Sequence, residues 1–241
     1  MNADAAHGQP ITPAEATAAV FVVIPAFNEA SCIEQVVQAV RAAGPLDVVV
    51  VDDGSTDGTG DLARRFTGHV LRHLINRGQG AALQTGIEFA LLAGARIIVT
   101  FDADGQHCAE DVSALVAPIE AGTCDIVLGS RFLGRAVGLP GGRRLLLRFG
   151  VWFTRLVSGA KLTDVHNGLR AFSRRAAERI RIRLDGMAHA SELVDQIVRS
   201  GLAYQEVPVT VRYTPYSKSK GQSSRGAFRV ALHYLLGRMI R

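Results

Sequence analysis

The sequence predicts an α/β fold in which helices flank a mostly parallel sheet. Short segments rich in Val and Ile alternate with longer segments whose apolar residues recur at helical spacing. Acidic and amide side chains directly follow several of the short segments. Hydrophobic residues make up 48% of the 241 residues, which is enough to bury the core of one large domain and excludes wholesale disorder.

The first half of the chain predicts five strands separated by helices. The predicted strands are short, apolar and suited to burial: Val20–Pro25, Leu46–Asp52, His69–Leu74, Arg96–Phe101 and Asp125–Gly129. The predicted helices between them are Ser31–Ala43, Asp57–Phe66, Gln79–Gly94 and Glu110–Ala121. Strands that alternate with helices in this way form a parallel sheet covered on both faces.

After Gly129 the pattern changes. We expect a glycine-rich loop over 134–142, a basic apolar helix over 143–157, and a segment over 163–172 that is first polar and then apolar. A helix over 189–200 and a strand over 204–213 follow, and then a polar, basic segment up to residue 225. We therefore predict a loose tail (1–18), one domain (19–225) and a basic amphipathic C-terminal helix (226–241).

The charge is divided unevenly along the chain. Residues 1–130 contain 16 Asp and Glu and 6 Lys and Arg, whereas residues 131–241 contain 6 acidic and 21 basic residues. The net charge of +5 hides this division. An acidic half and a basic half indicate different partners. A non-enzymatic nucleic-acid binder could use the basic half, but it would not need acidic residues at several strand ends.

Several classes of protein are disfavoured. Three cysteines without a CxxC pair make a disulfide framework unlikely and are compatible with a reducing cytoplasm. The first 20 residues lack the basic start and apolar run of a signal peptide. No uncharged apolar stretch is long enough to cross a bilayer. The seven histidines show no zinc-ligand spacing.

Asp102 and Asp104 form the most informative pair. They follow the predicted strand 96–101, so both carboxylates can reach one hard cation beyond the strand end. Such a cation would also bind the phosphates of a substrate and make a diphosphate a better leaving group. A solvated turn is the ordinary interpretation of an isolated DxD, but other polar strand ends would converge on the same edge of the sheet.

Two further loops carry polar residues after strands. Asp52 and Asp53 could accept hydrogen bonds from a base or a ribose, although a tight turn and a helix cap would explain the residues that follow them. Asn28 and Glu29 follow the first strand in the same manner. Gly80 lies at a glycine-rich helix start that could approach a phosphate or base.

Basic residues near the same edge of the sheet could bind phosphate. Arg131 follows the fifth predicted strand. Lys218 and Lys220 lie in a polar loop that could close over a phosphate, and a solvated cation is the simpler interpretation of either lysine alone.

In their order, the motifs resemble those of glycosyltransferase family 2, in particular its dolichol-phosphate mannosyltransferase-like branch. They are PAFNE, VVVVDDGSTDGT, NRGQGAALQTGI, DADGQH, GSRF, HNGLRAF, EVPVTVRY and SKSKGQS, and they cover about residues 20–222. The resemblance implies a GT-A (Rossmann-like) fold, a nucleoside diphosphate sugar donor and a Mg²⁺ or Mn²⁺ cofactor. Two departures are Gln79, where relatives often have Lys, and Cys108, where proline is common.

The resemblance also implies roles for particular residues. Asp102, Asp104 and Gln106 match the metal-binding loop, with Ala103 beside the donor. The nucleotide-binding loops are matched by Pro25, Ala26, Asn28, Glu29, Asp52 and Asp53. Arg131 matches an arginine that contacts the donor phosphate or the acceptor, and Lys220 matches a loop near the donor phosphates.

The expected reaction is an inverting glycosyl transfer to polyprenyl or dolichyl phosphate. A lipid phosphate is already ionised and needs no strong base, whereas a saccharide hydroxyl, the alternative acceptor, does. Glu192 is the candidate base or acceptor-positioning residue, and a solvated helix residue is the competing interpretation. A sugar nucleotidyltransferase is disfavoured because PAFNE replaces a glycine-rich loop after the first strand.

The basic helices predict where the protein works. Cationic amphipathic helices over 143–157 and 226–241 favour peripheral association with the cytoplasmic face of a membrane, with anionic lipid or a small membrane partner protein. Packing onto the domain or a homodimer partner is the alternative. We expect no nucleic-acid partner.

Overall fold

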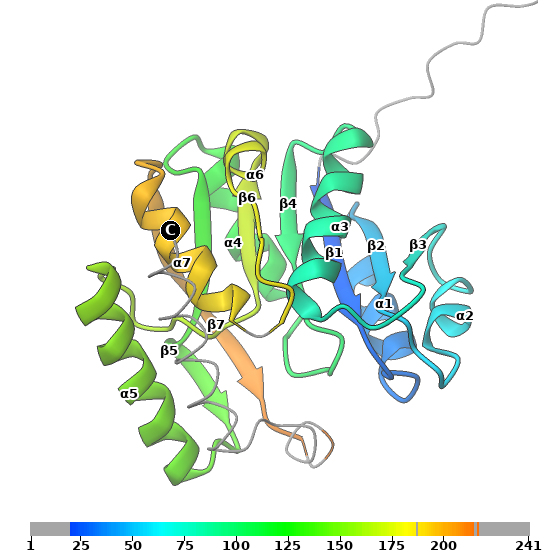
Figure 1. Cartoon of the computed structure of the whole chain (residues 1–241), viewed down its shortest axis with the longest axis horizontal. Helices are drawn as coiled ribbons and strands as arrows, with labels where there is room; N and C mark the ends of the chain where they lie inside the picture. The colour runs from blue at the N-terminus through cyan, green and yellow to red at the C-terminus, as the bar shows by residue number, and fades with distance from the viewer. Residues whose placement is uncertain (1–19, 187, 215, 217–241) are drawn as a thin grey trace, which may run out of the picture.

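The computed structural model of the chain describes residues 20–186, 188–214 and 216, and in these residues a mixed sheet is flanked by helices on both faces (Figure 1). The strands are β1 (Val20–Ala26), β2 (Asp47–Asp52), β3 (His69–Arg72), β4 (Ile97–Thr100), β5 (Ile126–Val137), β6 (Arg170–Ser173) and β7 (Tyr204–Arg212). The helices are α1 (Ile33–Ala42), α2 (Thr59–Ala63), α3 (Gln79–Leu92), α4 (Asp111–Glu120), α5 (Gly141–Ser158), α6 (Arg174–Arg179) and α7 (His189–Arg199). The predicted α/β class is confirmed.

The strand order brings the polar loops to one edge of the sheet. The order is β3-β2-β1-β4-β6-β5-β7. All neighbouring pairs are parallel except those of β6, which runs antiparallel to both β4 and β5. The carboxyl ends of β1, β2, β4, β5 and β7 therefore lie on the same side, where ligands bind in open α/β sheets.

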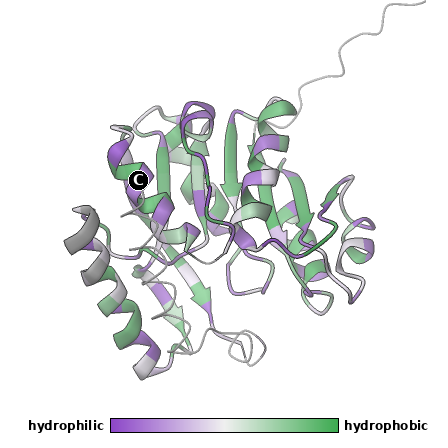
Figure 2. Cartoon of the chain, viewed as in Figure 1, coloured by the Kyte–Doolittle hydropathy of each residue, from purple (hydrophilic) through white to green (hydrophobic). Residues whose placement is uncertain are grey.

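Each face of the sheet carries its own apolar core, because side chains alternate along a strand. Val22 and Ile24 of β1 pack with residues of α1 and α4 on one face. Phe21 and Val23 pack with residues of α3 and α7 on the other. The strands are accordingly apolar along most of their length (Figure 2).

The structure corrects the predicted end of the fifth strand. β5 does not stop at Gly129 but continues to Val137, so the glycine-rich loop predicted to begin at residue 134 is wrong there. β7 continues beside it after a register shift between Ser130 and Arg135, across which the pairing advances five residues along β5 and two along β7. Gly134 permits this pairing, because a Cβ there would lie 2.2 Å from the carbonyl oxygen of Val209.

Other differences are smaller. β6 and α6 were not predicted as separate elements, and β3 ends two residues before the predicted Leu74, which is fully exposed. The predicted basic helix is present as α5. The predicted tail (1–18), Lys218, Lys220 and the C-terminal helix (226–241) lie outside the described residues. Within the described part, no helix is long and apolar enough to cross a membrane.

Candidate functional site

The loop after β4 presents the two predicted carboxylates. The Asp102 carboxylate accepts a hydrogen bond from Gln79 Nε2 at α3 (2.8 Å, to Oδ1) and is paired with His107 Nε2 (3.0 Å, to Oδ2). Gln79 is the residue that stands in place of a lysine in the motif, and here it orients Asp102. The carboxylate is thus held on both oxygens, by a side chain from the start of α3 and by one from its own loop.

His107 is built to hold Asp102 in one orientation. Its ring is buried and lies edge-on to Phe101, with 5.5 Å between ring centroids. Its Nδ1 is buried without a hydrogen-bond partner among the described residues. An unpaired lone pair costs less than an unpaired N–H, so we assign the proton to Nε2, which donates to Asp102.

Asp104 lies in a different environment from Asp102. Its carboxylate accepts hydrogen bonds from the backbone N–H of Gln106 (3.1 Å) and from the Gln106 side-chain amide. Burial and the neighbouring charge of Asp102 raise the pKa of Asp104. Burial would also raise the pKa of Asp102, but the hydrogen bond from His107 and nearby positive charges lower it overall. Two neighbouring carboxylates therefore repel each other in this loop.

This donor set fits a hard divalent cation. Carboxylate oxygens are the preferred ligands of Mg²⁺ and Mn²⁺, and a cation would relieve the repulsion that raises the pKa of Asp104. In the described residues no three His, Cys, Asp or Glu side chains form a complete metal centre. The two carboxylates would therefore supply part of the coordination, with substrate phosphate oxygens and water supplying the rest.

Residues 168–170 form the floor beneath Asp102. A Cβ on Gly168 would lie 2.2 Å from Asp102 Oδ2, so the backbone passes directly against the carboxylate. Thr100 Oγ1 donates to the Gly168 carbonyl (2.6 Å) and fixes that approach. Arg170 is buried nearby, and burial, opposed by the charges of Asp102 and Asp164, lowers its pKa to about 10. A buried cation thus lies beneath the acidic loop.

Arg131 lies on β5, within the register shift against β7, and its side chain is already bonded to other protein groups. Its Nε donates to Asp164 Oδ2 (2.6 Å), and its Nη1 donates to the hydroxyl of Tyr213 (2.6 Å). Its backbone N–H also donates to Asp164 Oδ2 (3.1 Å). Burial would lower the pKa of Arg131, but the negative charge of Asp164 raises it overall. The guanidinium is therefore charged, fixed in direction and nearly buried.

The loop after β2 fixes the loop after β1. Three successive backbone N–H groups, of residues 28, 29 and 30, donate to the side chains of Ser55 (2.9 Å), Thr59 (2.8 Å) and Asp57 (3.0 Å). Asn28 adopts a left-handed conformation (φ 53°) and accepts from the Thr56 backbone N–H (3.0 Å). The motif GSTDGT therefore shapes the PAFNE loop, a role that neither motif shows by itself.

Asp53 and Asp52 are also anchored. Asp53 accepts from the backbone N–H groups of Arg77 (3.0 Å) and Gly78 (2.7 Å) and pairs with His73 Nδ1 (2.7 Å). Asp52 accepts from the Ser55 backbone N–H (2.9 Å). Both carboxylates are almost completely buried. Asp53 thus holds the loop before α3 in place. A direct nucleotide contact by either aspartate stays a prediction.

The remaining predicted residues mostly have packing roles. The N–H of Gly80 donates to the Asp185 carbonyl (2.7 Å), and a Cβ on Gly80 would lie 2.1 Å from the Leu184 carbonyl oxygen. Pro25 and Ala26 are buried at the end of β1, and Ala103 is buried in the core between the two aspartates. Their nucleotide contacts stay predictions.

Glu192 is neither exposed nor solvated. It is 3% exposed, and its Oε2 accepts the backbone N–H groups of Arg183 (3.0 Å) and Leu184 (2.8 Å). These hydrogen bonds tie α7 to the loop that packs on Gly80. A role as a base stays a prediction. Lys220, as stated, lies outside the described residues.

Sequence reasoning missed Asp164, Gly168 and Tyr213 as parts of this site. The signal for Asp164 was present, because an acid in the polar segment 163–172 of a basic half is unusual. Tyr213 carried no such signal, since an aromatic residue at the end of an alternating strand is typical of a core.

The chain is similar to several known proteins. The family model described as glycosyl transferase family 2 matches residues 21–181. A polyprenol monophosphomannose synthase of Mycolicibacterium smegmatis is 33% identical, with 91% of this chain and 88% of that protein covered. A UDP-N-acetylglucosamine–dolichyl-phosphate N-acetylglucosaminyltransferase of Methanococcus voltae is 30% identical, with 91% and 96% covered.

A solved structure is similar over nearly the whole chain. It is the glucosyl-3-phosphoglycerate synthase of Mycobacterium tuberculosis in complex with Mn²⁺, uridine-diphosphate-glucose and phosphoglyceric acid. The TM-score is 0.67 and the identity 25%, with 95% of this chain and 85% of that chain covered. Together with the family match and the DADGQH loop at the carboxyl edge of the sheet, these likenesses establish that the chain belongs to glycosyl transferase family 2 and is a glycosyltransferase of the GT-A fold.

Proposed function

We propose that the enzyme transfers a sugar from a nucleoside diphosphate sugar to a polyprenyl or dolichyl phosphate, with inversion at the anomeric carbon. The observation that carries the proposal is the pairing of two chemistries at one edge of the sheet: the repelling carboxylates of Asp102 and Asp104, and the fixed, nearly buried cation of Arg131. The named relatives that act on polyprenol and dolichyl phosphate support it.

The acidic loop would serve the donor. Asp102, Asp104 and Gln106 would hold Mg²⁺ or Mn²⁺, with Gln79 and His107 keeping Asp102 in place. When bound, the cation neutralises the diphosphate and makes it a better leaving group. The complex of the structural relative with Mn²⁺ and uridine-diphosphate-glucose supports this use of a divalent cation. The nucleotide would lie against the loops that follow β1 and β2, near Asn28, Glu29 and Asp53.

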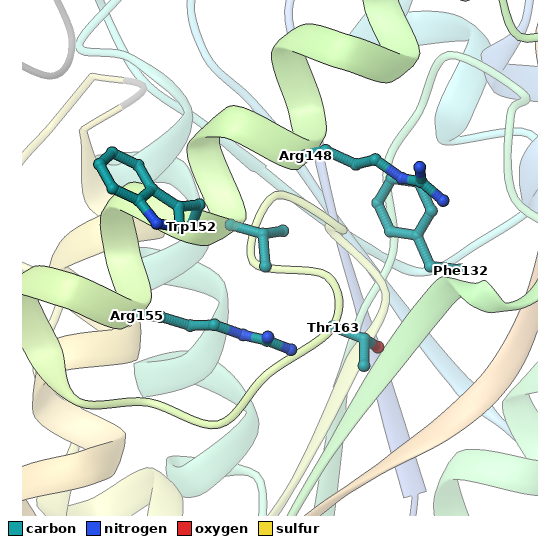
Figure 3. A pocket seen from close by; sticks show the side chains of 6 residues that line it. Phe132, Arg148, Trp152, Arg155 and Thr163 are labelled. Carbon is teal, nitrogen blue, oxygen red and sulfur yellow. The ribbon is translucent and has the colours of Figure 1, made fainter.

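The basic side would receive the acceptor. A pocket of about 270 Å³ lies between α5 and β5, lined by Phe132, Arg148, Val151, Trp152, Arg155 and Thr163 (Figure 3). Phe132 and Thr163 are the chain neighbours of Arg131 and its partner Asp164. Apolar and cationic walls suit a lipid phosphate, whose ionised oxygen can attack the anomeric carbon without a base.

Helix α5 would bring the enzyme to the lipid. Leu145, Phe149 and Trp152 are 73%, 58% and 57% exposed. The helix also carries Arg143, Arg144, Arg148 and Arg155 and no acidic residue. A helix with exposed aromatic residues and arginines is suited to the interface of an anionic membrane, and we propose peripheral association with its cytoplasmic face. A second copy or a small membrane partner could cover the same face.

A transfer assay tests the reaction. The protein is incubated with labelled GDP-mannose, UDP-glucose or UDP-N-acetylglucosamine, polyprenyl phosphate and Mn²⁺ or Mg²⁺, and chloroform-soluble sugar is measured. We expect lipid-linked product that is abolished by a chelator and by Asp104→Asn in a folded variant. A water-soluble saccharide product alone would instead favour the hydroxyl acceptor, with Glu192 as candidate base. No metal-dependent nucleotide binding and no product would overturn the proposal.

Vesicle sedimentation tests the membrane role of α5. Vesicles of phosphatidylglycerol and phosphatidylcholine are mixed with wild type, with the double variant Phe149→Ser/Trp152→Ser, and with Leu92→Ser as control. Leu92 is 90% exposed on α3, so its loss removes apolar surface elsewhere. Burial of two aromatic side chains stabilises binding by roughly 2 kcal/mol or more, so we expect at least about tenfold weaker binding of the double variant only. Equal binding of all three would contradict the role of α5.

A further inference from the structure

Two tyrosines just beyond β7 contact opposite sides of the candidate site. The hydroxyl of Tyr213 accepts a hydrogen bond from Arg131 Nη1 (2.6 Å), and the guanidinium of Arg143 lies over its ring, 5.3 Å from the centroid. The hydroxyl of Tyr216 donates to Glu29 Oε2 (2.8 Å) in the loop after β1. One tyrosine thus contacts the proposed acceptor side and the other the proposed donor side.

Each contact is made to a group that is itself fixed. Arg131 is held by Asp164, and Tyr213 is 6% exposed, with its backbone N–H donating to the Val137 carbonyl (2.9 Å). Glu29 is 9% exposed, and its own backbone N–H is held by Thr59. The hydroxyl of each tyrosine is therefore hydrogen-bonded to a buried side chain.

The strand order shows how far apart these groups lie in the sheet. Glu29 follows β1 and Arg131 lies on β5, and these strands are separated by β4 and β6, which amounts to three strand spacings of about 4.8 Å, or roughly 14 Å. Three residues of extended chain cover only about 10 Å. The tyrosine side chains must therefore reach in different directions to connect the two sides (β1 and β5 in Figure 1).

We propose that Tyr213 and Tyr216 are positioning residues that bridge the donor and acceptor sides and fix the position of the loop after β1 relative to Arg131. What they align rests on the proposed function, whereas the bridge itself does not. Such a bridge acts on the transition state, in which both substrates must be aligned, more than on the binding of either substrate alone. The loss of one hydroxyl should therefore lower kcat and leave the donor KM nearly unchanged.

The first experiment needs no turnover. Thermal midpoints are measured for wild type, Tyr216→Phe, Glu29→Ala, which removes the acceptor, and the double variant, in the full chain. If the two side chains are paired in solution, the double variant loses clearly less than the sum of the two single losses. Additive losses would overturn the bridge, whatever reaction the enzyme catalyses.

The second experiment separates alignment from mere stability. Initial rates are measured for Tyr216→Phe and Tyr213→Phe with the donor that supports transfer, at a temperature where each variant is fully folded. Tyr204→Phe, at the opposite end of β7, is the control. We expect kcat to fall about tenfold for the two bridge variants, with the donor KM within twofold and the control unchanged.

The outcomes distinguish the two proposals. Wild-type kcat in folded Tyr216→Phe would overturn the positioning role even if lipid-linked product forms. Coupling in the first experiment together with no transfer from any donor would support the bridge and count against the proposed function.

Discussion

The substitution Gly168→Ala is expected to disable the acidic loop without adding or removing a charge. The backbone of Gly168 lies against the carboxylate of Asp102, and an alanine Cβ would lie 2.2 Å from Oδ2 and 2.6 Å from Oδ1. Real Cβ contacts are essentially never shorter than 3.0 Å, so the two groups must separate by about 0.8 Å. The backbone of Gly168 is outside the left-handed region, so alanine causes no backbone strain there.

We expect the carboxylate of Asp102, and not the backbone of Gly168, to move. The Gly168 carbonyl is held by Thr100 Oγ1, and the segment continues into the paired strand β6. Moving the carboxylate stretches its contacts with Gln79 and His107, each of a kind that contributes about 1.5–3 kcal/mol. A misplacement near 1 Å can lower a rate about 100-fold, so we expect a loss of that order in transfer and much weaker Mn²⁺-dependent nucleotide binding.

The assay compares Gly168→Ala with Gly68→Ala. A Cβ on Gly68 would meet nothing within 4 Å, and Gly68 precedes β3, far along the sheet from β4. Calorimetric titration with UDP or GDP, with and without Mn²⁺, measures binding, and circular dichroism confirms the fold. Wild-type Mn²⁺ dependence in a folded Gly168→Ala protein would refute the reasoning, because it would show that the position of Asp102 does not govern the cation.

Three more predictions concern buried charges. Asp164→Leu leaves Arg131 buried and unpaired, which costs about 3–5 kcal/mol of stability. Because each kcal/mol shifts the thermal midpoint by about 2–4 °C, the midpoint should fall by about 6–20 °C. An unchanged midpoint would contradict the pairing of Arg131 with Asp164. Asp53→Asn should lose about 2 kcal/mol in urea unfolding, because an amide cannot serve all three of its donors, and faster hydrogen exchange at Gly78 should accompany it. His189 is buried, which with the charge of Arg170 lowers its pKa from 6.5 to about 4. The unfolded chain therefore binds this proton at a higher pH than the folded protein does. Between pH 6.5 and pH 4 the free energy of unfolding should consequently decrease by about 1.4 kcal/mol for each unit by which the pH drops. The same slope of the free energy of unfolding in His189→Asn would count against this prediction.

Much of the fold follows from local pattern. Short continuous apolar runs predicted β1, β2 and β4, with their ends nearly correct, because burial on both faces of a parallel sheet demands such runs. The same reasoning failed at β5. There the strand continues through an exposed glycine-containing segment because β7 lies beside it, and no local signal marks a partner about 75 residues away along the chain.

The position of the site could be predicted from the sequence, but the roles of its individual residues could be predicted less well. Asp102 and Asp104 could be placed together from spacing alone. Asp53 and Glu192 have the same local appearance as substrate-binding acids, yet their carboxylates hold backbone N–H groups of other loops. Whether an acidic side chain accepts hydrogen bonds from other loops of the protein depends on residues that only folding brings near. Composition and spacing could therefore not distinguish such an acid from one that binds a substrate.

The sequence by itself determined the α/β class, the gathering of polar loops at one edge of the sheet, and the division into an acidic first half and a basic second half, because these depend on hydrophobic period and on charge count. Only the tertiary structure decided what the charges do. The basic half is not simply a cationic surface: Arg131 is buried against Asp164, and Arg170 is buried beneath Asp102. A buried charge must find an opposite charge or hydrogen-bond partners in space, and that requirement joined residues that lie far apart in the chain.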